Sequence, residues 1–210
     1  MKLLLTSSGL KNKIIRVFFV KTAGNIRGKK IGIVTSAQGL DGQKYIDESF
    51  AEVRDLGMIP YEINISTNDS FENLPEIDLW YVCGGNTYEI LDRIRKTGLD
   101  KILLSEIAKN KYYIGVSAGS IITSRDIIAS GWGIDGDEQK GTETNGFGLI
   151  DFHILPHYNV VRNEKDVVSL HKHLKKSVVG LTDEQAIYIT DNQQKLIGEK
   201  GGLINGKIVL

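Results

Sequence analysis

The sequence predicts an α/β fold in which a mostly parallel sheet is flanked by helices on both faces. Over the first 120 residues, short apolar segments alternate with segments whose apolar residues have helical spacing. Parallel strands need crossover connections, and helices between the strands supply them. Glycine is frequent (23 residues) and proline scarce (3), as many tight strand-to-helix turns require. We therefore expect a single α/β domain over residues 1–210, long enough to bury a sizeable core.

The elements of the first half follow from periodicity and turn residues. Short apolar runs predict strands, and apolar residues three and four positions apart predict helices. Gly57 follows the second helix, in the place that glycine often takes after a helix C-terminus. Strands are expected at 3–6, 30–35, 61–65, 79–83 and 112–116, and helices at 11–20, 43–56, 88–95 and 99–109.

From residue 127 onward the pattern changes to short extended runs separated by glycine-rich turns, which predicts a small β-rich C-terminal part. No internal repeat and no low-complexity linker interrupts the chain, which also favours one domain. One helix is expected at 164–176, with strands at 186–190, 195–197 and 207–210.

The composition excludes several classes of protein. Lys+Arg (26) equals Asp+Glu (26), so no overall basic field exists to bind nucleic acid or an anionic membrane, and we expect neither partner. The single cysteine, Cys83, cannot form an internal disulfide or, with four histidines, a cysteine-rich zinc cluster, so no metal is expected. These features predict a cytoplasmic protein.

A candidate nucleophile lies in Gly115-Val116-Ser117-Ala118-Gly119, which follows an apolar strand and precedes a possible helix start. This is the G-x-S-x-G nucleophile elbow in the context that the motif requires, with Ser117 exposed at the strand end. The alternative interpretation is a glycine-rich turn that holds an anion at a helix N-terminus. The context favours the nucleophile. Ser120 is the competing hydroxyl, but it lies outside the elbow position.

A serine nucleophile needs a base, and His157 is the best placed of the four histidines. His171 and His173 lie in a lysine-rich segment that predicts a solvated helix face. Pro156 opposes a helix that would bring His153 and His157 together as metal ligands. We therefore expect His153 in the core or beside it and His157 at the site.

The base needs a carboxylate to orient it, and the sequence leaves that residue open. Asp183 and Glu184 lie at a junction between two predicted strands, and Asp135 and Asp137 lie in a glycine-rich segment. The order serine, histidine, acid differs from the order serine, acid, histidine of ordinary α/β-hydrolases, which disfavours that fold.

Backbone N–H groups of Ala118 and Gly85 are the candidates for an oxyanion hole, because glycine lets the backbone approach a ligand closely. Asn86 follows as a helix N-cap and a candidate substrate-binding residue. Cys83 precedes this turn inside an apolar strand and is expected to be a small buried side chain rather than a nucleophile.

Four segments together resemble the serine-peptidase family of peptidase E (aspartyl dipeptidase) and cyanophycinase. The resemblance spans about residues 31 to 189, and the Gly-Gly-Asn and Ser-Ala-Gly motifs in this order are fairly specific. It implies a fold similar to class I glutamine amidotransferase domains, with serine in place of their cysteine. The segments are Tyr81-Val82-Cys83-Gly84-Gly85-Asn86-Thr87, Gly115-Val116-Ser117-Ala118-Gly119-Ser120, Pro156-His157-Tyr158 and Gly180-Leu181-Thr182-Asp183-Glu184-Gln185-Ala186-Ile187.

The resemblance also implies a catalytic triad. It places the family's nucleophile on Ser117, its histidine on His157 and its acid on Asp183, where some members carry glutamate. Because aspartate is one methylene shorter, Glu184 could reach in instead, and an aspartate between serine and histidine keeps Asp135 open.

The sequence thus predicts a serine peptidase that cleaves a small peptide, such as an Asp-containing dipeptide, without a cofactor. A cationic residue is expected to bind an acidic substrate side chain. Arg162 is the first candidate, and Arg125 is another. Family resemblance alone suggests a homodimer. The alternatives are a non-catalytic protein that binds a small ligand on the same scaffold and an esterase that uses the same site.

Overall fold

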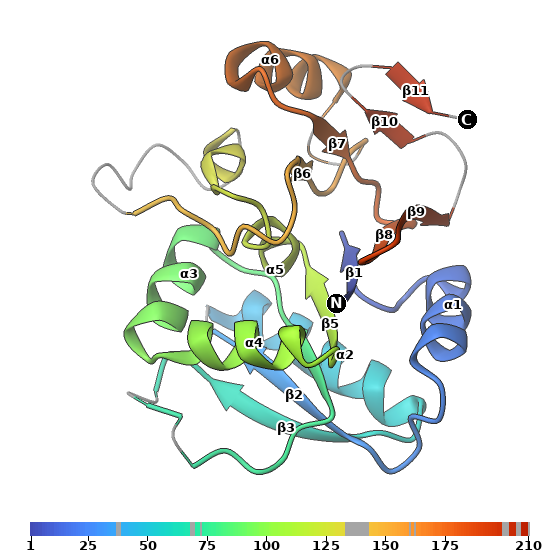
Figure 1. Ribbon diagram of the computed structural model, residues 1–210, viewed down its shortest axis with the longest axis vertical. Helices are drawn as coiled ribbons and strands as arrows, with labels where there is room; N and C mark the ends of the chain where they lie inside the picture. The colour runs from blue at the N-terminus through green and yellow to red at the C-terminus, as the bar shows by residue number, and fades with distance from the viewer. Residues whose placement is uncertain are drawn as a thin grey trace.

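A sheet of seven strands lies at the centre of the described part of the chain in the computed structural model (Figure 1). Its strand order is β3-β2-β4-β5-β1-β8-β9; the first five strands run parallel, and β8 and β9 extend the sheet antiparallel beyond β1. The structure describes residues 1–36, 39–67, 70–71, 73–132, 143–159, 161, 163–198, 202–204 and 207–209. The strands are β1 (Lys2–Thr6), β2 (Lys30–Thr35), β3 (Ile59–Asn64), β4 (Leu79–Val82), β5 (Tyr112–Val116), β8 (Gln185–Thr190) and β9 (Gln193–Gly198).

Helices cover both faces of this sheet, which confirms the predicted fold class. On one face, Phe19 of α1 and Val53 of α2 pack in a buried cluster with Leu4 and Ile114 of the sheet. On the other face, α3, α4 and α5 contribute to a larger buried cluster, as Leu103 of α4 illustrates. The helices are α1 (Lys13–Ala23), α2 (Gly39–Asp55), α3 (Thr87–Lys96), α4 (Leu99–Ala108) and α5 (Ala118–Ile121).

Asparagine side chains fix the starts of two helices. The Oδ1 atom of Asn12 accepts hydrogen bonds from the N–H groups of Ile14 and Ile15, so α1 begins at Lys13, two residues later than expected. Asn86 caps α3 in the same way and accepts from the Glu89 N–H at 3.0 Å. Such caps satisfy N–H groups that the first turn of a helix leaves without partners. Asn86 thereby holds the glycine turn that precedes α3.

A second sheet, in the order β11-β10-β7-β6, lies with helix α6 at the end of the molecule away from β2 and β3 (Figure 1). Ile154 of β6 and Val179 of β7 belong to the same buried cluster as Leu3 and Leu5 of β1, so the two sheets share a core. The β-rich C-terminal part was predicted, but its division between two sheets was not. The elements are η1 (Ile128–Gly131), β6 (His153–Leu155), α6 (Glu164–Leu174), β7 (Val178–Gly180), β10 (Gly202–Ile204) and β11 (Lys207–Val209).

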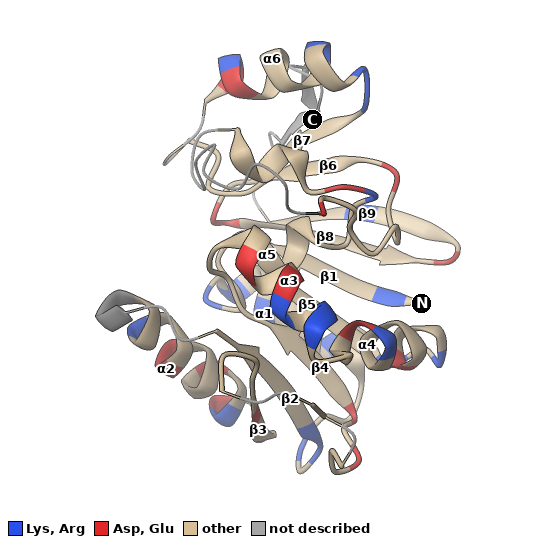
Figure 2. Ribbon diagram, turned by 90° about the vertical axis from the view of Figure 1, so that its left-hand side faces the viewer, with Lys and Arg blue, Asp and Glu red and all other residues tan. Residues whose placement is uncertain are grey.

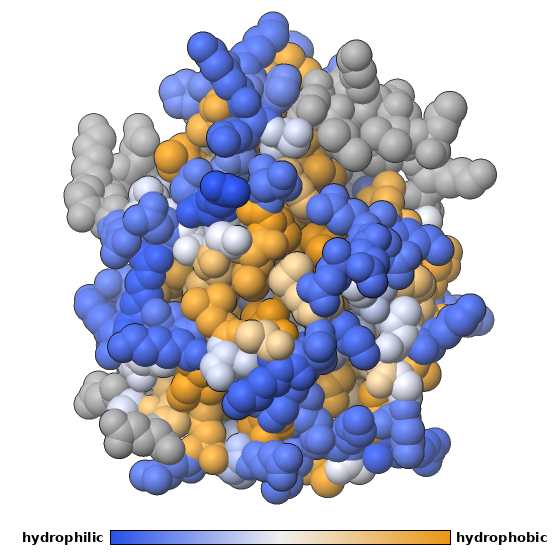
Figure 3. Space-filling view, viewed as in Figure 1, coloured by the Kyte–Doolittle hydropathy of each residue, from blue (hydrophilic) through white to orange (hydrophobic). Residues whose placement is uncertain are grey.

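The surface carries charges of both signs. Figure 2 shows basic and acidic residues interspersed along α2, α3 and α4 rather than separated by sign. In Figure 3, hydrophobic residues gather in the middle of the face, between the more hydrophilic regions of α6 and α4. In the described part of the chain, no helix has both the length and the apolar character needed to cross a membrane.

Candidate active site

Ser117 lies in a tight turn between β5 and α5, at the carboxyl end of a central parallel strand. Its φ is 49°, in the left-handed region that non-glycine residues rarely occupy. A Cβ on Gly115 would lie 2.5 Å from the Gly119 carbonyl oxygen, and a Cβ on Gly119 would lie 2.2 Å from that of Val82. The two glycines thus let the backbone pack closely enough to form the nucleophile elbow that the motif predicted.

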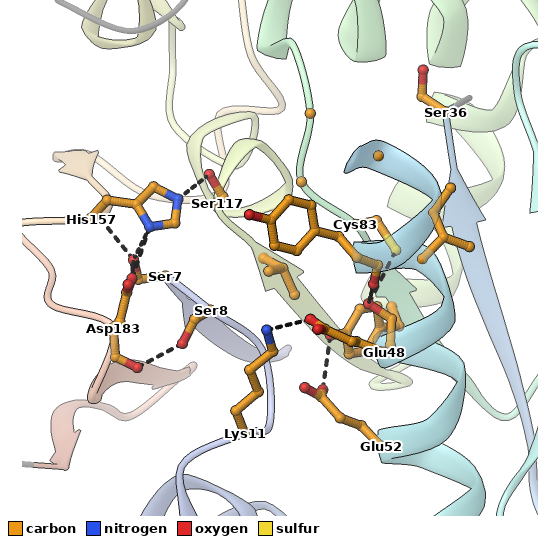
Figure 4. Close-up of a pocket in the computed structure, with 18 of the residues that line it drawn as sticks. Ser7, Ser8, Lys11, Ser36, Glu48, Glu52, Cys83, Ser117, His157 and Asp183 are labelled. Carbon is orange, nitrogen blue, oxygen red and sulfur yellow. Dashed lines mark hydrogen bonds and ion pairs between the residues drawn. The ribbon is translucent and has the colours of Figure 1, made fainter. Parts of the chain in front are cut away.

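His157 faces Ser117 from the segment that follows β6 (Figure 4). The distance between His157 Nε2 and Ser117 Oγ is 3.0 Å, and His157 Nδ1 lies 2.8 Å from Asp183 Oδ1. The structure therefore brings together the three side chains that the sequence placed 40 and 26 residues apart. His157 follows β6 of the second sheet, and Asp183 lies in the turn between β7 and β8.

The charge state of Asp183 fixes the tautomer of His157. The hydrogen bond from His157 is the largest cause that lowers the pKa of Asp183; burial opposes it, and a hydrogen bond from Ser7 adds to it. An ionised carboxylate only accepts hydrogen bonds, so His157 Nδ1 carries the proton and Nε2 is left to accept from the Ser117 hydroxyl. This is the arrangement that a general base for a serine nucleophile needs.

The neighbouring Glu184, which the sequence left open as the acid, points elsewhere. Its Oε2 accepts a hydrogen bond from Asn12 Nδ2, next to the start of α1, and its side chain is exposed. Asp135 and Asp137, the other two candidates, lie outside the described residues.

Ser7 also belongs to the site, although none of the sequence motifs includes it. This buried side chain at the end of β1 donates to Asp183 Oδ1 at 2.6 Å and accepts from the His157 backbone N–H at 2.7 Å. Its neighbour Ser8 donates to the Asp183 carbonyl oxygen at 2.7 Å. Three consecutive hydroxyl residues, Thr6, Ser7 and Ser8, at the end of an apolar strand were the available signal, because such ends converge in a parallel sheet.

Replacing Ser7 with alanine should lower kcat about tenfold or more without a matching change in KM. The change removes a donor to Asp183 and leaves the part-buried His157 N–H without its acceptor. An unsatisfied buried donor costs about 1–3 kcal/mol, and a part-buried one costs less. The kinetics of wild type and variant, with their urea unfolding curves, measure both effects. Ser8→Ala is the matched control and should keep kcat within about threefold, because Ser8 donates to the Asp183 backbone carbonyl and not to its carboxylate. A wild-type kcat in Ser7→Ala would show that Ser7 does not position His157 and Asp183.

The two predicted oxyanion-hole residues flank Ser117 on different elements. Ala118 begins α5, where the first N–H groups of a helix lack acceptors within the helix. Gly85 has a φ of 145°, a conformation that favours glycine, and lines the same cavity as Ser117. Asn86 uses its side chain to cap α3, and Arg162, the other candidate substrate-binding residue, lies outside the described residues.

A cavity of about 680 Å³ extends from Ser117 and His157 towards α2. Its lining includes Gly84, Gly85 and Glu52, and Figure 4 shows the side chains that project into it. This volume is in the range of pockets that hold small ligands. In the part of the chain that the structure describes, no cluster of three or more His, Cys, Asp or Glu residues is arranged to hold a metal ion.

The remaining candidates lie where the sequence placed them. Ser120 is buried and donates to the carbonyl oxygens of β1 and β5, away from His157. Burial raises the pKa of Cys83 to about 12, so the thiol stays protonated and is no nucleophile. His153 is buried on β6, whereas His171 and His173 lie on the more exposed side of α6.

Comparison with known proteins identifies the family. The model of peptidase family S51 matches residues 3–197. A protein from Listeria monocytogenes named as an uncharacterized peptidase is 34% identical over 165 residues, covering 76% of this chain and 79% of that protein. The chain belongs to peptidase family S51. It is thus a serine peptidase, as the sequence predicted.

Relatives of the S51 peptidase include proteins named peptidase E. The one from Nostoc is 27% identical over 184 residues, covering 82% of this chain and 74% of its own length. A crystal structure described as a candidate peptidase E from Listeria monocytogenes superposes with a TM-score of 0.76 at 27% identity and covers 95% of this chain and 98% of its own. A peptidase from an acI-B1 Actinobacterium, 15% identical with a TM-score of 0.68, shares the fold and covers 97% and 89% of the two chains.

Proposed function

We propose that this S51 peptidase hydrolyses a peptide bond through an acyl-enzyme on Ser117, with His157 as general base and Asp183 as the carboxylate that orients it. One observation carries the proposal: the unbroken hydrogen-bonded chain from Ser117 Oγ through His157 to Asp183, with distances of 3.0 and 2.8 Å. Such a chain matches the geometry and roles by which serine hydrolases on unrelated folds are recognised.

In the proposed reaction, Ser117 Oγ attacks the carbonyl carbon while His157 Nε2 takes the hydroxyl proton. The N–H groups of Gly85 and Ala118 hold the oxyanion of the tetrahedral intermediate. His157 then gives the proton to the leaving amine as the C–N bond breaks. Water, deprotonated by His157, attacks the ester in turn, and the proton returns to Ser117 as the carboxylic acid product leaves.

The proposed substrate is a short peptide, with an Asp-containing dipeptide as the first to test. The peptidase E names among the relatives and the motif resemblance support this choice, as does a cavity that suits a small ligand. A panel of Asp-Xaa and other Xaa dipeptides, with simple esters beside them, separates peptidase from esterase activity.

Labelling with a fluorophosphonate tests the mechanism directly. The reagent should attach to one serine, and peptide mass spectrometry should locate the adduct on Ser117. An adduct on another serine, or none on active protein, would refute the assignment.

A further inference from the structure

Glu52, a buried residue of α2, places a carboxylate in the cavity beside Ser117. The residue is 6% exposed. It accepts from the Leu10 N–H at 2.9 Å and from the Tyr81 hydroxyl at 3.1 Å. Both bonds end on Oε2, so within the described part of the chain Oε1 has no protein donor, although the residue lines the cavity. Because Glu52 lines the cavity, a ligand bound there can supply a donor to Oε1.

The loop between β1 and α1 ties this carboxylate to the proposed catalytic side chains. Ser7 contacts His157 and Asp183, and three residues later the Leu10 N–H binds Glu52. Three residues of chain span at most about 11 Å, so the Leu10 N–H that binds Glu52 lies within about that distance of Ser7. A bound peptide of a few residues is long enough to reach from Ser117 to Glu52. Between them, Gly9 packs so closely that a Cβ would lie 2.5 Å from the Tyr81 hydroxyl.

The charges around the cavity favour a cationic ligand. Among the described lining residues, Glu48, Glu52 and Asp183 are carboxylates, whereas Lys11 is the one ammonium. Lys11 Nζ lies 2.5 Å from Glu48 Oε2, and Asp183 is bound by His157, so two of the carboxylates already have partners (Figure 4). Among the described residues, Glu52 forms no salt bridge, although Lys11 and Arg16 lie near enough to oppose the rise in its pKa. Its burial raises the pKa of its carboxyl group, and a bound cation would compensate for the water that the ionised form lacks.

We propose that Glu52 binds a cationic group of the peptide, either its free α-ammonium or a lysine or arginine side chain, in the cavity beside Ser117. The proposal rests on the proposed peptidase function and adds a specificity-determining residue to it. Recognition of the α-ammonium would make the enzyme act at peptide N-termini. Recognition of a side chain would make it prefer a basic residue near the scissile bond.

Binding of three small probes to the Ser117→Ala protein shows, without any turnover, whether the cationic group is the α-ammonium or a side chain. Norleucine amide carries the α-ammonium, N-acetyllysine amide carries only the side-chain ammonium, and N-acetylnorleucine amide carries neither. We expect one cationic probe to bind about tenfold or more tightly than the neutral probe in calorimetric or NMR titrations. The additional change Glu52→Gln should abolish that difference, because the isosteric amide keeps the acceptor for Leu10 and Tyr81 but directs an N–H₂ group at the cation.

Two further variants control for fold and net charge. Glu52→Asp keeps the carboxylate and should retain part of the preference for the cationic probe. The melting temperatures of all variants show whether each one is folded. Asp47→Asn removes one charge from an exposed position of the same helix and should leave the preference unchanged. Equal binding of all probes, no binding of any, or a preference that survives Glu52→Gln would overturn the proposal. Fluorophosphonate labelling of Ser117 in wild type reports on the proposed function separately.

Discussion

Replacing Ser117 with alanine should abolish peptide hydrolysis and fluorophosphonate labelling while the protein stays folded. In the proposed mechanism the substitution removes the atom that forms the acyl-enzyme, and loss of a serine nucleophile costs about 10⁴-fold or more in kcat. Ser117 Oγ contacts His157 at the edge of a cavity, so its removal leaves the core intact. Steady-state kinetics on the best dipeptide, with circular dichroism of both proteins, measure the two effects.

Ser120→Ala is the matched control, since it removes the other hydroxyl of the same motif. Ser120 bonds to the carbonyl oxygens of Thr6 and Gly115, so its loss should cost about 1 kcal/mol of stability and leave labelling in place. Hydrolysis or labelling that persists in Ser117→Ala would place the nucleophile elsewhere.

The sequence predicted the central sheet well because its signals are local. Apart from β3, each parallel strand is a short apolar run, and the turns that follow β4 and β5 are marked by glycines that the packing requires, as Gly119 against Val82 shows. The elbow at Ser117 could be predicted for the same reason. His157 follows β6 of the second sheet, so its place beside Ser117 depends on how the two sheets pack on their shared core.

The choice between Asp183 and Glu184 could not be made from the sequence because distant residues decide it. The two acids are adjacent in one turn, and either could in principle face His157. Ser7 and Ser8 bind Asp183, whereas Asn12 binds Glu184, and all three contacts join residues more than 170 positions apart. The division of the C-terminal strands between two sheets has the same cause, because strands of three residues carry too little pattern to specify a partner.

Replacing Asp183 with asparagine should lower kcat by about 10³- to 10⁴-fold. An amide can present its N–H₂ group to His157 Nδ1, which would stabilise the tautomer with its proton on Nε2. That tautomer cannot accept the Ser117 proton, so the base is lost although the side chains keep their places. Kinetics at neutral pH measure the loss, and NMR of the His157 ring reports the tautomer.

Glu184→Gln is the matched control, one residue away and with the same loss of charge. Because Glu184 contacts Asn12 rather than His157, we expect kcat within about twofold of wild type.

Asp183→Asn and Glu184→Gln should also differ in their stability at acid pH. Because the pKa of Asp183 is lowered in the folded protein, its ionised form stabilises the fold at pH values above the ordinary pKa of 3.8. This contribution is lost as the pH falls through the lowered pKa. Asp183→Asn should lack that part of the acid sensitivity, whereas Glu184→Gln should keep it. A large loss of kcat in Glu184→Gln with little in Asp183→Asn would reverse the assignment of the acid.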